Sequence, residues 1–143
     1  MTLSWDSEWL NHLVINLESD ESIGLAQSIL LNIKGGRIQC AGWLHGEYFM
    51  FLYSIGKDKP KATKFPVTFE VSVAAGAAMI IERKFLNMIG LFEPKVPFFY
   101  DDTLLSFKTW LGGKRVVTVS NSIVYHEGMA ATNATENPTF CYL

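Results

Sequence analysis

The chain has 143 residues, 49% of them hydrophobic and 13% aromatic, with a formal net charge of −2. This length suits one ordinary domain with a single core, and the composition excludes an intrinsically disordered chain. The slightly negative charge lacks the basic footprint of nucleic-acid binding, so we expect no nucleic-acid partner.

Apolar runs in the sequence fall far short of the roughly 20 residues that a membrane-spanning helix needs. The first residues also lack a basic region followed by an apolar one, so we expect a soluble, cytoplasmic chain. The two cysteines, Cys40 and Cys141, are far apart and have no neighbouring metal ligands. Neither a disulfide framework nor a zinc site is expected.

The first half of the chain predicts one helix followed by strands. Residues 7–18 carry apolar side chains at helical spacing after a candidate N-cap, Asp6, so this helix should lie with its apolar face on a sheet. Residues 23–31 read as a buried strand and residues 37–43 as a second, short one. Residues 48–53 are aromatic and favour either a strand or a packed loop.

A polar stretch, residues 56–64, contains four lysines. We interpret it as a mobile, solvated loop, and the alternative is a basic patch that meets phosphate.

The second half predicts alternating strands and short helices. Gly90 and residues 112–113 are candidate helix ends, because glycine is favoured just beyond the last helical turn. After Gly128 the sequence is small and polar without periodicity, which predicts a flexible tail over 129–143. The elements expected are strands 67–73 and 77–81, helix 82–89, a helix beginning at Asp101 or Asp102, and strands 115–119 and 122–126.

Adjacent carboxylates open the predicted second long helix. At a helix N-terminus, Asp101 and Asp102 are stabilised as anions by free backbone amides and the helix dipole. Because adjacent side chains point in different directions, one carboxylate can cap the helix while the other faces a cleft and takes a proton from an attacking hydroxyl. The alternative is that both only cap the helix. The preceding proline-bounded aromatic segment, residues 94–100, favours a position at the mouth of a site.

Two further features suit a ligand site. The loop at residues 74–78 has no side chain larger than a methyl group, so a ligand ring can lie against its backbone; tight packing of a helix on a sheet is the alternative. His126 ends a strand, where a neutral imidazole can bind a divalent metal or simply be a polar surface residue.

The order and spacing of these features resemble the C-terminal half of an inverting family 2 glycosyltransferase of the GT-A fold, over nearly all of the chain. The small-residue loop, a turn at residues 89–93, the aspartate pair and the final strand end match that family's loop, "GxFDE" turn, "YxED" helix start and "YH" strand end. Residues 4–10 are similar to the segment that follows the family's metal-binding DxD motif.

The resemblance implies an α/β fold, a truncated GT-A-like mixed sheet flanked by helices. Residues 1–128 would form a partial domain that lacks the N-terminal nucleotide-binding half and its DxD motif. Asp102 would be the general base for the acceptor hydroxyl, and Asp101, in place of the usual Glu, would support it. His126 would approach a divalent metal, Mn or Mg. The remaining implied positions, for substrate binding, are Gly76, Ala77, Ala78, Tyr100 and Lys108.

The implied activity is sugar transfer with inversion, from a nucleotide-sugar donor to the hydroxyl of a carbohydrate or lipid-linked acceptor, with the metal stabilising the departing diphosphate. A homodimer or a partner chain would supply the missing half. The sequence departs from the family at Leu104, where many members carry an acid, and at Lys108, where they carry Arg. The main alternative is a non-catalytic interaction module, or an inactive remnant, that associates through an open sheet edge. A metal hydrolase built on the aspartates and His126 has too few ligands.

Overall fold

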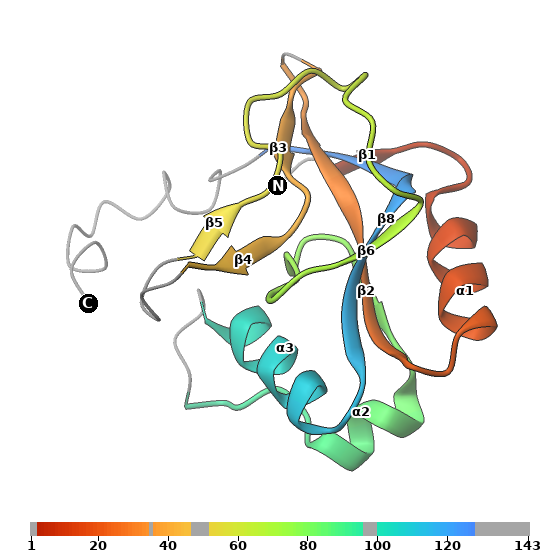
Figure 1. Ribbon diagram of the computed structural model, residues 1–143, viewed down its shortest axis with the longest axis vertical. Coiled ribbons are helices and arrows are strands. Elements are labelled where there is room, and N and C mark those ends of the chain that lie inside the picture. The colour runs from red at the N-terminus through yellow and green to blue at the C-terminus, as the bar shows by residue number, and fades with distance from the viewer. Residues whose placement is uncertain (1–2, 35, 47–51, 96–99, 128–143) are drawn as a thin grey trace.

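The computed structural model describes residues 3–34, 36–46, 52–95 and 100–127, and in this part of the chain a six-stranded mixed sheet forms the centre (Figure 1). A separate pair of strands and three helices surround it among the same residues. The elements in chain order are β1 (Leu3–Trp5), α1 (Trp9–Ser19), β2 (Ile23–Asn32), β3 (Ile38–Cys40), β4 (Trp43–His45), β5 (Leu52–Ser54), β6 (Thr68–Glu70), β7 (Met79–Ile81), α2 (Arg83–Ile89), α3 (Asp101–Leu111) and β8 (Arg115–His126).

The two long strands β2 and β8 lie parallel to each other at the centre of the sheet. Their pairing runs from Ile23 opposite Arg115 to Asn32 opposite His126. The two strands expected at 115–119 and 122–126 are therefore one strand, which corrects the sequence prediction. The register shifts where Ser28 pairs with Val119 and the next residue, Ile29, pairs with Ile123, so residues 120–122 bulge out without ending the strand.

Four short strands complete the sheet by antiparallel pairing. β1 and β6 pair with different stretches of β8, while β3 and β7 pair with different stretches of β2. One parallel pair among antiparallel neighbours makes the sheet mixed, and the expected mixed sheet flanked by helices is confirmed.

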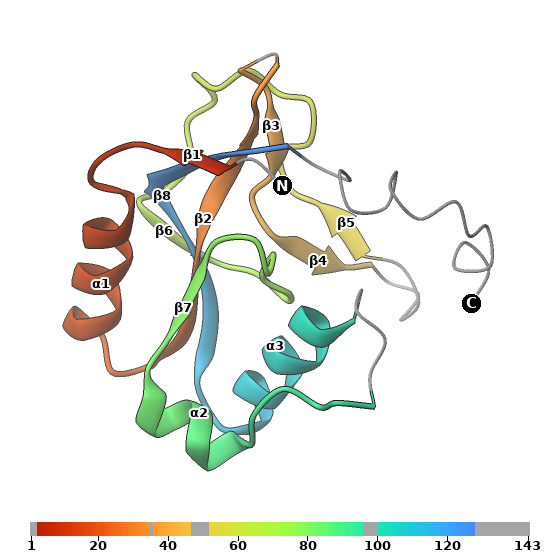
Figure 2. The same ribbon diagram turned by 180° about the vertical axis from the view of Figure 1, so that it is seen from behind.

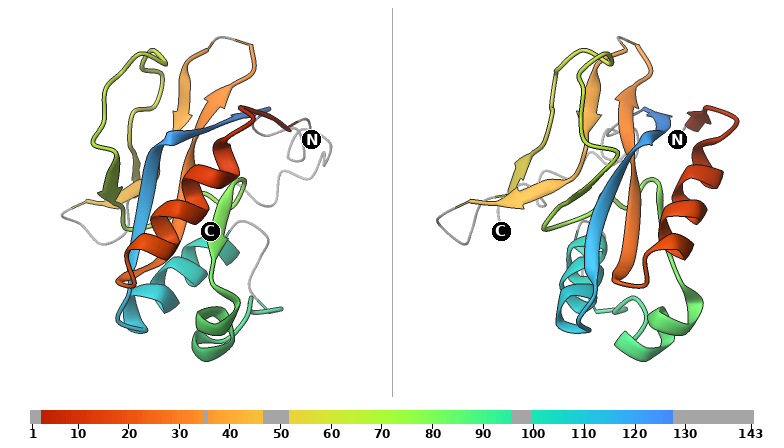
Figure 3. Two further views of the ribbon diagram at one scale, coloured as in Figure 1. Left: turned by 90° about the vertical axis from the view of Figure 1, so that its right-hand side faces the viewer. Right: turned by 45° about the vertical axis from the view of Figure 1, so that its right-hand side comes forward.

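Helices cover both faces of the sheet (Figure 3). On one face, Leu13 of α1 is fully buried against Ile23 and Val117, so the predicted amphipathic helix is confirmed. Its N-cap is Glu8 and not Asp6, whose backbone carbonyl instead accepts a hydrogen bond from Trp9 at 3.2 Å. α3 lies on the other face, where Leu105 packs in a second cluster of buried residues with Leu25 and Val116.

The second predicted strand, residues 37–43, is broken into β3 and β4. The break occurs at Gly42, whose φ is +97° and whose added Cβ would lie 2.6 Å from a methyl group of Val71. Only glycine suits both constraints, so the chain turns there and β4 leaves the central sheet to pair with β5. Within residues 48–53, the described part contributes to β5, and residues 48–51 lie outside the described residues.

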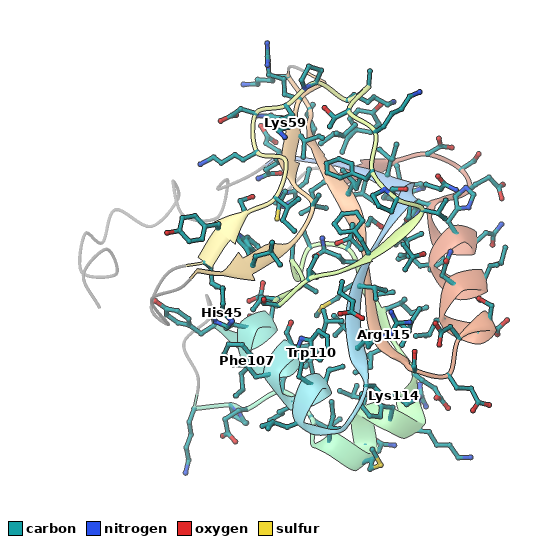
Figure 4. All side chains as sticks on the ribbon, in the orientation of Figure 1. His45, Lys59, Phe107, Trp110, Lys114 and Arg115 are labelled. Carbon is teal, nitrogen blue, oxygen red and sulfur yellow. The ribbon has the colours of Figure 1, made fainter. Side chains whose placement is uncertain are left out.

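The lysine-containing stretch, residues 56–64, is bonded to β3. Ile38 donates its amide to the carbonyl of Lys59, and Asp58 donates to the carbonyl of Ile38, both at 2.8 Å. Lys59 lies in the upper part of the molecule as drawn in Figure 4. That residues 56–64 are mobile, or meet phosphate, stays a prediction. The flexible tail predicted over 129–143 lies outside the described residues. No helix in the described part of the chain is long and apolar enough to cross a membrane.

Candidate active site

The small-residue loop at residues 74–78 passes between β2 and α3 before it enters β7 (Figure 2). On the β2 side, the buried side chain of Gln27 accepts a hydrogen bond from the Ala75 amide through Oε1, and the Ser28 amide donates to the Ala78 carbonyl at 3.0 Å. Ala78 is buried, whereas Gly76 is exposed. The inner alanines therefore serve the tight packing that was the alternative to a ligand loop, and the surface near Gly76 stays open to a ligand.

On the other side, three residues of α3 hold the same segment in succession. The Asp102 carboxylate accepts the Gly76 amide at 3.1 Å, the Ser106 hydroxyl accepts the Ala74 amide at 3.0 Å, and the Trp110 indole donates to the Ser72 carbonyl at 3.2 Å. Four helical residues rise about 6 Å, close to the roughly 6.6 Å covered by two extended residues. This match in repeat lets one helix face bind every second residue of the segment.

Ser106 offers a test of this arrangement. In Ser106→Ala the buried Ala74 amide loses its partner, so we expect a stability loss of about 1–3 kcal/mol and faster hydrogen exchange at that amide. Ser19→Ala, at an exposed hydroxyl on α1, is the matched control and should change stability by less than about 0.5 kcal/mol. Equal effects of the two substitutions, measured by urea unfolding, would contradict the role given to Ser106.

Asp102 is a partly buried carboxylate beside the small-residue loop. Burial raises the pKa of its carboxyl group, while hydrogen bonds from the Gly76 and Thr103 amides oppose the shift. Space is tight, because a Cβ added at Gly76 would lie 3.2 Å from the Asp102 Cβ. A partly buried carboxylate with a raised pKa beside an exposed glycine has the properties of a general base.

The aspartates differ from the prediction in their helical position. Tyr100 is the N-cap of α3, and Asp101 and Asp102 lie in the first turn, which corrects the expectation that one of them caps the helix. Each carboxylate still accepts the next amide: Asp101 Oδ1 from Asp102 at 2.9 Å, and Asp102 Oδ1 from Thr103 at 2.7 Å. The first-turn amides are thus satisfied locally, and Asp102 Oδ2 reaches across to Gly76.

The predicted substrate-binding residues differ in how near they lie to the Asp102 carboxylate. Gly76 contacts Asp102 directly, Ala77 is next to it and half-buried, and Tyr100 is exposed where α3 begins. Lys108 points away from Asp102. Its ammonium group donates a hydrogen bond of 2.8 Å to the carbonyl of Leu91, which follows the end of α2.

His126 ends β8 beside β3. Its Nδ1 lies 3.0 Å from Gln39 Oε1, and its buried Nε2 has no partner among the described residues. Burial lowers the pKa of the imidazole, which favours the neutral form. An Nδ1–H bonded to Gln39 leaves the lone pair of Nε2 available, the arrangement of a metal-binding histidine.

Adjacent residues of β3 interact with His126 and with Asp102. Gln39 contacts His126, and burial raises the pKa of the next residue, Cys40, with a smaller contribution from the Asp102 charge. No group of three His, Cys, Asp or Glu side chains suited to one metal ion occurs within the described ranges. Among the described residues His126 is therefore at most one ligand of a metal whose other ligands come from elsewhere.

Three residues that position the loop were missed in the sequence: Gln27, Ser106 and Trp110. Gln27 is a polar residue inside the apolar run of β2, and it is fully buried there. Ser106 and Trp110 follow Asp102 at intervals of four residues, which places all three on one helix face. The polar residue in an apolar strand and the four-residue spacing can both be seen in the sequence. The segment that these side chains bind, residues 72–76, cannot.

Comparisons with known proteins support the fold. No protein-family model matches this sequence, and no curated protein matches it. Among solved structures, GalNAc-T7 with UDP, GalNAc and Mn2+ is similar, with a TM-score of 0.63 and 20% sequence identity over 87% of this chain. The match covers 26% of the GalNAc-T7 chain, so this chain spans about a quarter of that protein's length. At this identity the likeness shows the fold alone: the chain has a GT-A-like glycosyltransferase fold.

Proposed function

We propose that this chain is part of a family 2-like glycosyltransferase catalytic domain in which Asp102 is the general base. The observation that carries the proposal is the partly buried Asp102 carboxylate, held at the start of α3 against the exposed Gly76. The GT-A-like fold supports the proposal, because the similar GalNAc-T7 structure holds UDP, GalNAc and Mn2+.

In the proposed reaction, the Asp102 carboxylate takes the proton of the acceptor hydroxyl. The acceptor oxygen forms a bond to the anomeric carbon of the donor sugar, and the bond from that carbon to the phosphate oxygen breaks. The nucleoside diphosphate leaves with the electron pair, and the configuration at the anomeric carbon inverts. Asp101 supports the base, because its Oδ1 accepts the Asp102 amide and fixes the first turn of α3.

A divalent metal, Mn or Mg, would supply charge stabilisation to the departing diphosphate. His126 is the described residue that would hold it, through Nε2, which has no partner among the residues that the structure describes. The other ligands would come from the diphosphate and from a nucleotide-binding part, supplied by a partner chain or a second copy.

Donor binding tests whether this chain by itself contributes to the donor site. We expect nucleoside diphosphate sugars with manganese to raise the melting temperature of the chain, because a ligand that binds only the native state stabilises it by about 2.7 kcal/mol at a hundredfold excess over Kd. His126→Gln should abolish the metal-dependent part of the rise. His12→Gln, on α1, is the matched control and should keep it. No rise with any donor, with or without manganese, would refute donor binding by this chain.

A further inference from the structure

A hollow of about 340 Å³ lies beside α3, between the end of β4 and residues 70–72. Aromatic side chains line it: Phe107 and Trp110 on α3, and His45 at the end of β4, which packs against Phe107 (Figure 4). The hollow adjoins the hydrogen bonds that hold residues 72–76 on α3 and shares Trp110 and Ser72 with them.

Its aromatic rings are held in place by the fold. The His45 and Phe107 rings stack with centroids 5.2 Å apart and an interplanar angle of 18°. The Trp110 indole is anchored by its hydrogen bond to the Ser72 carbonyl, yet 37% of the residue remains exposed. An anchored and partly exposed ring offers flat apolar surface with little loss of side-chain entropy on binding.

Polar groups stand beside these rings. The Glu70 carboxylate is 3.2 Å from the Arg115 guanidinium, which also pairs with Asp20, and its side chain is 55% exposed. The Ser72 hydroxyl accepts the His45 amide at 3.1 Å, so its own hydrogen can be donated. The hollow therefore combines a fixed carboxylate acceptor, a hydroxyl donor and aromatic surface.

This combination selects one class of ligand. A sugar ring has an apolar face of C–H groups and a rim of hydroxyls, so it can lie on an aromatic ring while its hydroxyls bond to a carboxylate and a hydroxyl. The Glu70 charge disfavours a phosphate group. We propose that the hollow binds a sugar ring of the acceptor, an inference that rests on the proposed transferase function.

Tryptophan indole resonances give a direct test. The chain has four tryptophans, so a nitrogen-15 correlation spectrum resolves four indole N–H signals, and Trp110→Phe identifies the one from Trp110. We expect methyl glycosides and disaccharides of glucose, galactose, mannose and N-acetylglucosamine to shift the Trp110 signal in a saturable way. The signals of Trp5 and Trp9, whose rings lie near each other on β1 and α1, should stay in place. No saturable shift with any of these saccharides would overturn the inference.

Substitutions in the hollow test whether the shift of the Trp110 signal reports binding there. Glu70→Gln keeps an acceptor for Arg115 but removes the charge, and Phe107→Leu removes the ring; each should weaken saccharide binding at least tenfold. Leu111→Ala is the control on α3, because Leu111 is 89% exposed and does not line the hollow. Unchanged affinity in Glu70→Gln and Phe107→Leu, with melting temperatures near that of the original chain, would also overturn the inference.

The two proposals can fail separately. A donor-induced rise in melting temperature without any saccharide shift would leave the transferase proposal standing and overturn the sugar site. Saccharide binding, together with an unchanged KM for the acceptor when Glu70→Gln is tested for transfer in the complete enzyme, would keep the sugar site and overturn its role as an acceptor subsite.

Discussion

Asp102→Asn should decrease sugar transfer by a factor of about 10²–10⁴, because the amide cannot take the acceptor's proton. The Asn side chain keeps one oxygen, so it can accept the amide of Gly76 or that of Thr103 but not both, as the carboxylate does through Oδ2 and Oδ1. The measurement is kcat for transfer from a nucleotide sugar in the complete enzyme. Asp101→Asn is the matched control and should have a smaller effect, because the Asp101 Oδ1 contact goes to the Asp102 backbone.

The same substitution should change how stability depends on pH. Burial raises the pKa of Asp102 in the folded chain, so ionising the carboxyl group costs folded-state stability as the pH rises through that raised value. Below the ordinary value of 3.8 the group is protonated in both states and the cost disappears. Asn does not ionise, and the hydrogen bond that it loses is lost at every pH. We therefore expect the melting temperature of the original chain to fall relative to that of Asp102→Asn as the pH rises from below 3.8 to neutrality. A difference that stays constant over this range would contradict the raised pKa.

Activity should follow the same titration. The base must be ionised, so kcat/KM should fall as the pH drops through a pKa above that of an ordinary aspartate. An acid limb at or below the ordinary aspartate range would contradict the assignment of Asp102 as the base.

Gly24→Ala should cause a large loss of stability. The added Cβ would lie 2.7 Å from each of three atoms: Lys114 Cβ, a ring carbon of Phe85 and the Thr109 methyl group. Phe85 belongs to α2 and Thr109 to α3, so relieving two of these contacts would disturb a helix. Overpacking of this kind costs about 1–3 kcal/mol or more, measured as the free energy of unfolding in urea.

A double-mutant cycle tests the cause. Phe85→Leu removes the ring edge that the new methyl group meets, so combining it with Gly24→Ala should destabilise the chain by less than the sum of the two single changes. Ile15→Ala, at a residue 62% exposed on α1, should be additive with Gly24→Ala. Additivity in both pairs would show that the cost of Gly24→Ala does not come from the Phe85 contact.

The sequence by itself determined the main elements and the place of the aspartates. Apolar spacing in residues 7–18 and 23–31 reports which faces are buried, because each period depends only on near neighbours along the chain. Gly90 ends α2 with a φ of +86°, as its position after the apolar run predicts. The aspartate pair opens a helix, although one position later than a cap, because capping depends on backbone angles that differ by single residues.

The tertiary structure alone decided which residues gather around Asp102. The three side chains that hold the amides of residues 74–76 come from 48, 32 and 26 residues away in the sequence. Lys108 faces the end of α2, and residues 115–126 stay extended through a polar bulge because β2 pairs with both parts of the strand. These outcomes depend on packing between distant segments, for which local periodicity carries no information. The hollow lined by His45, Glu70 and Phe107 exists for the same reason, because it forms only where separate elements of the fold meet.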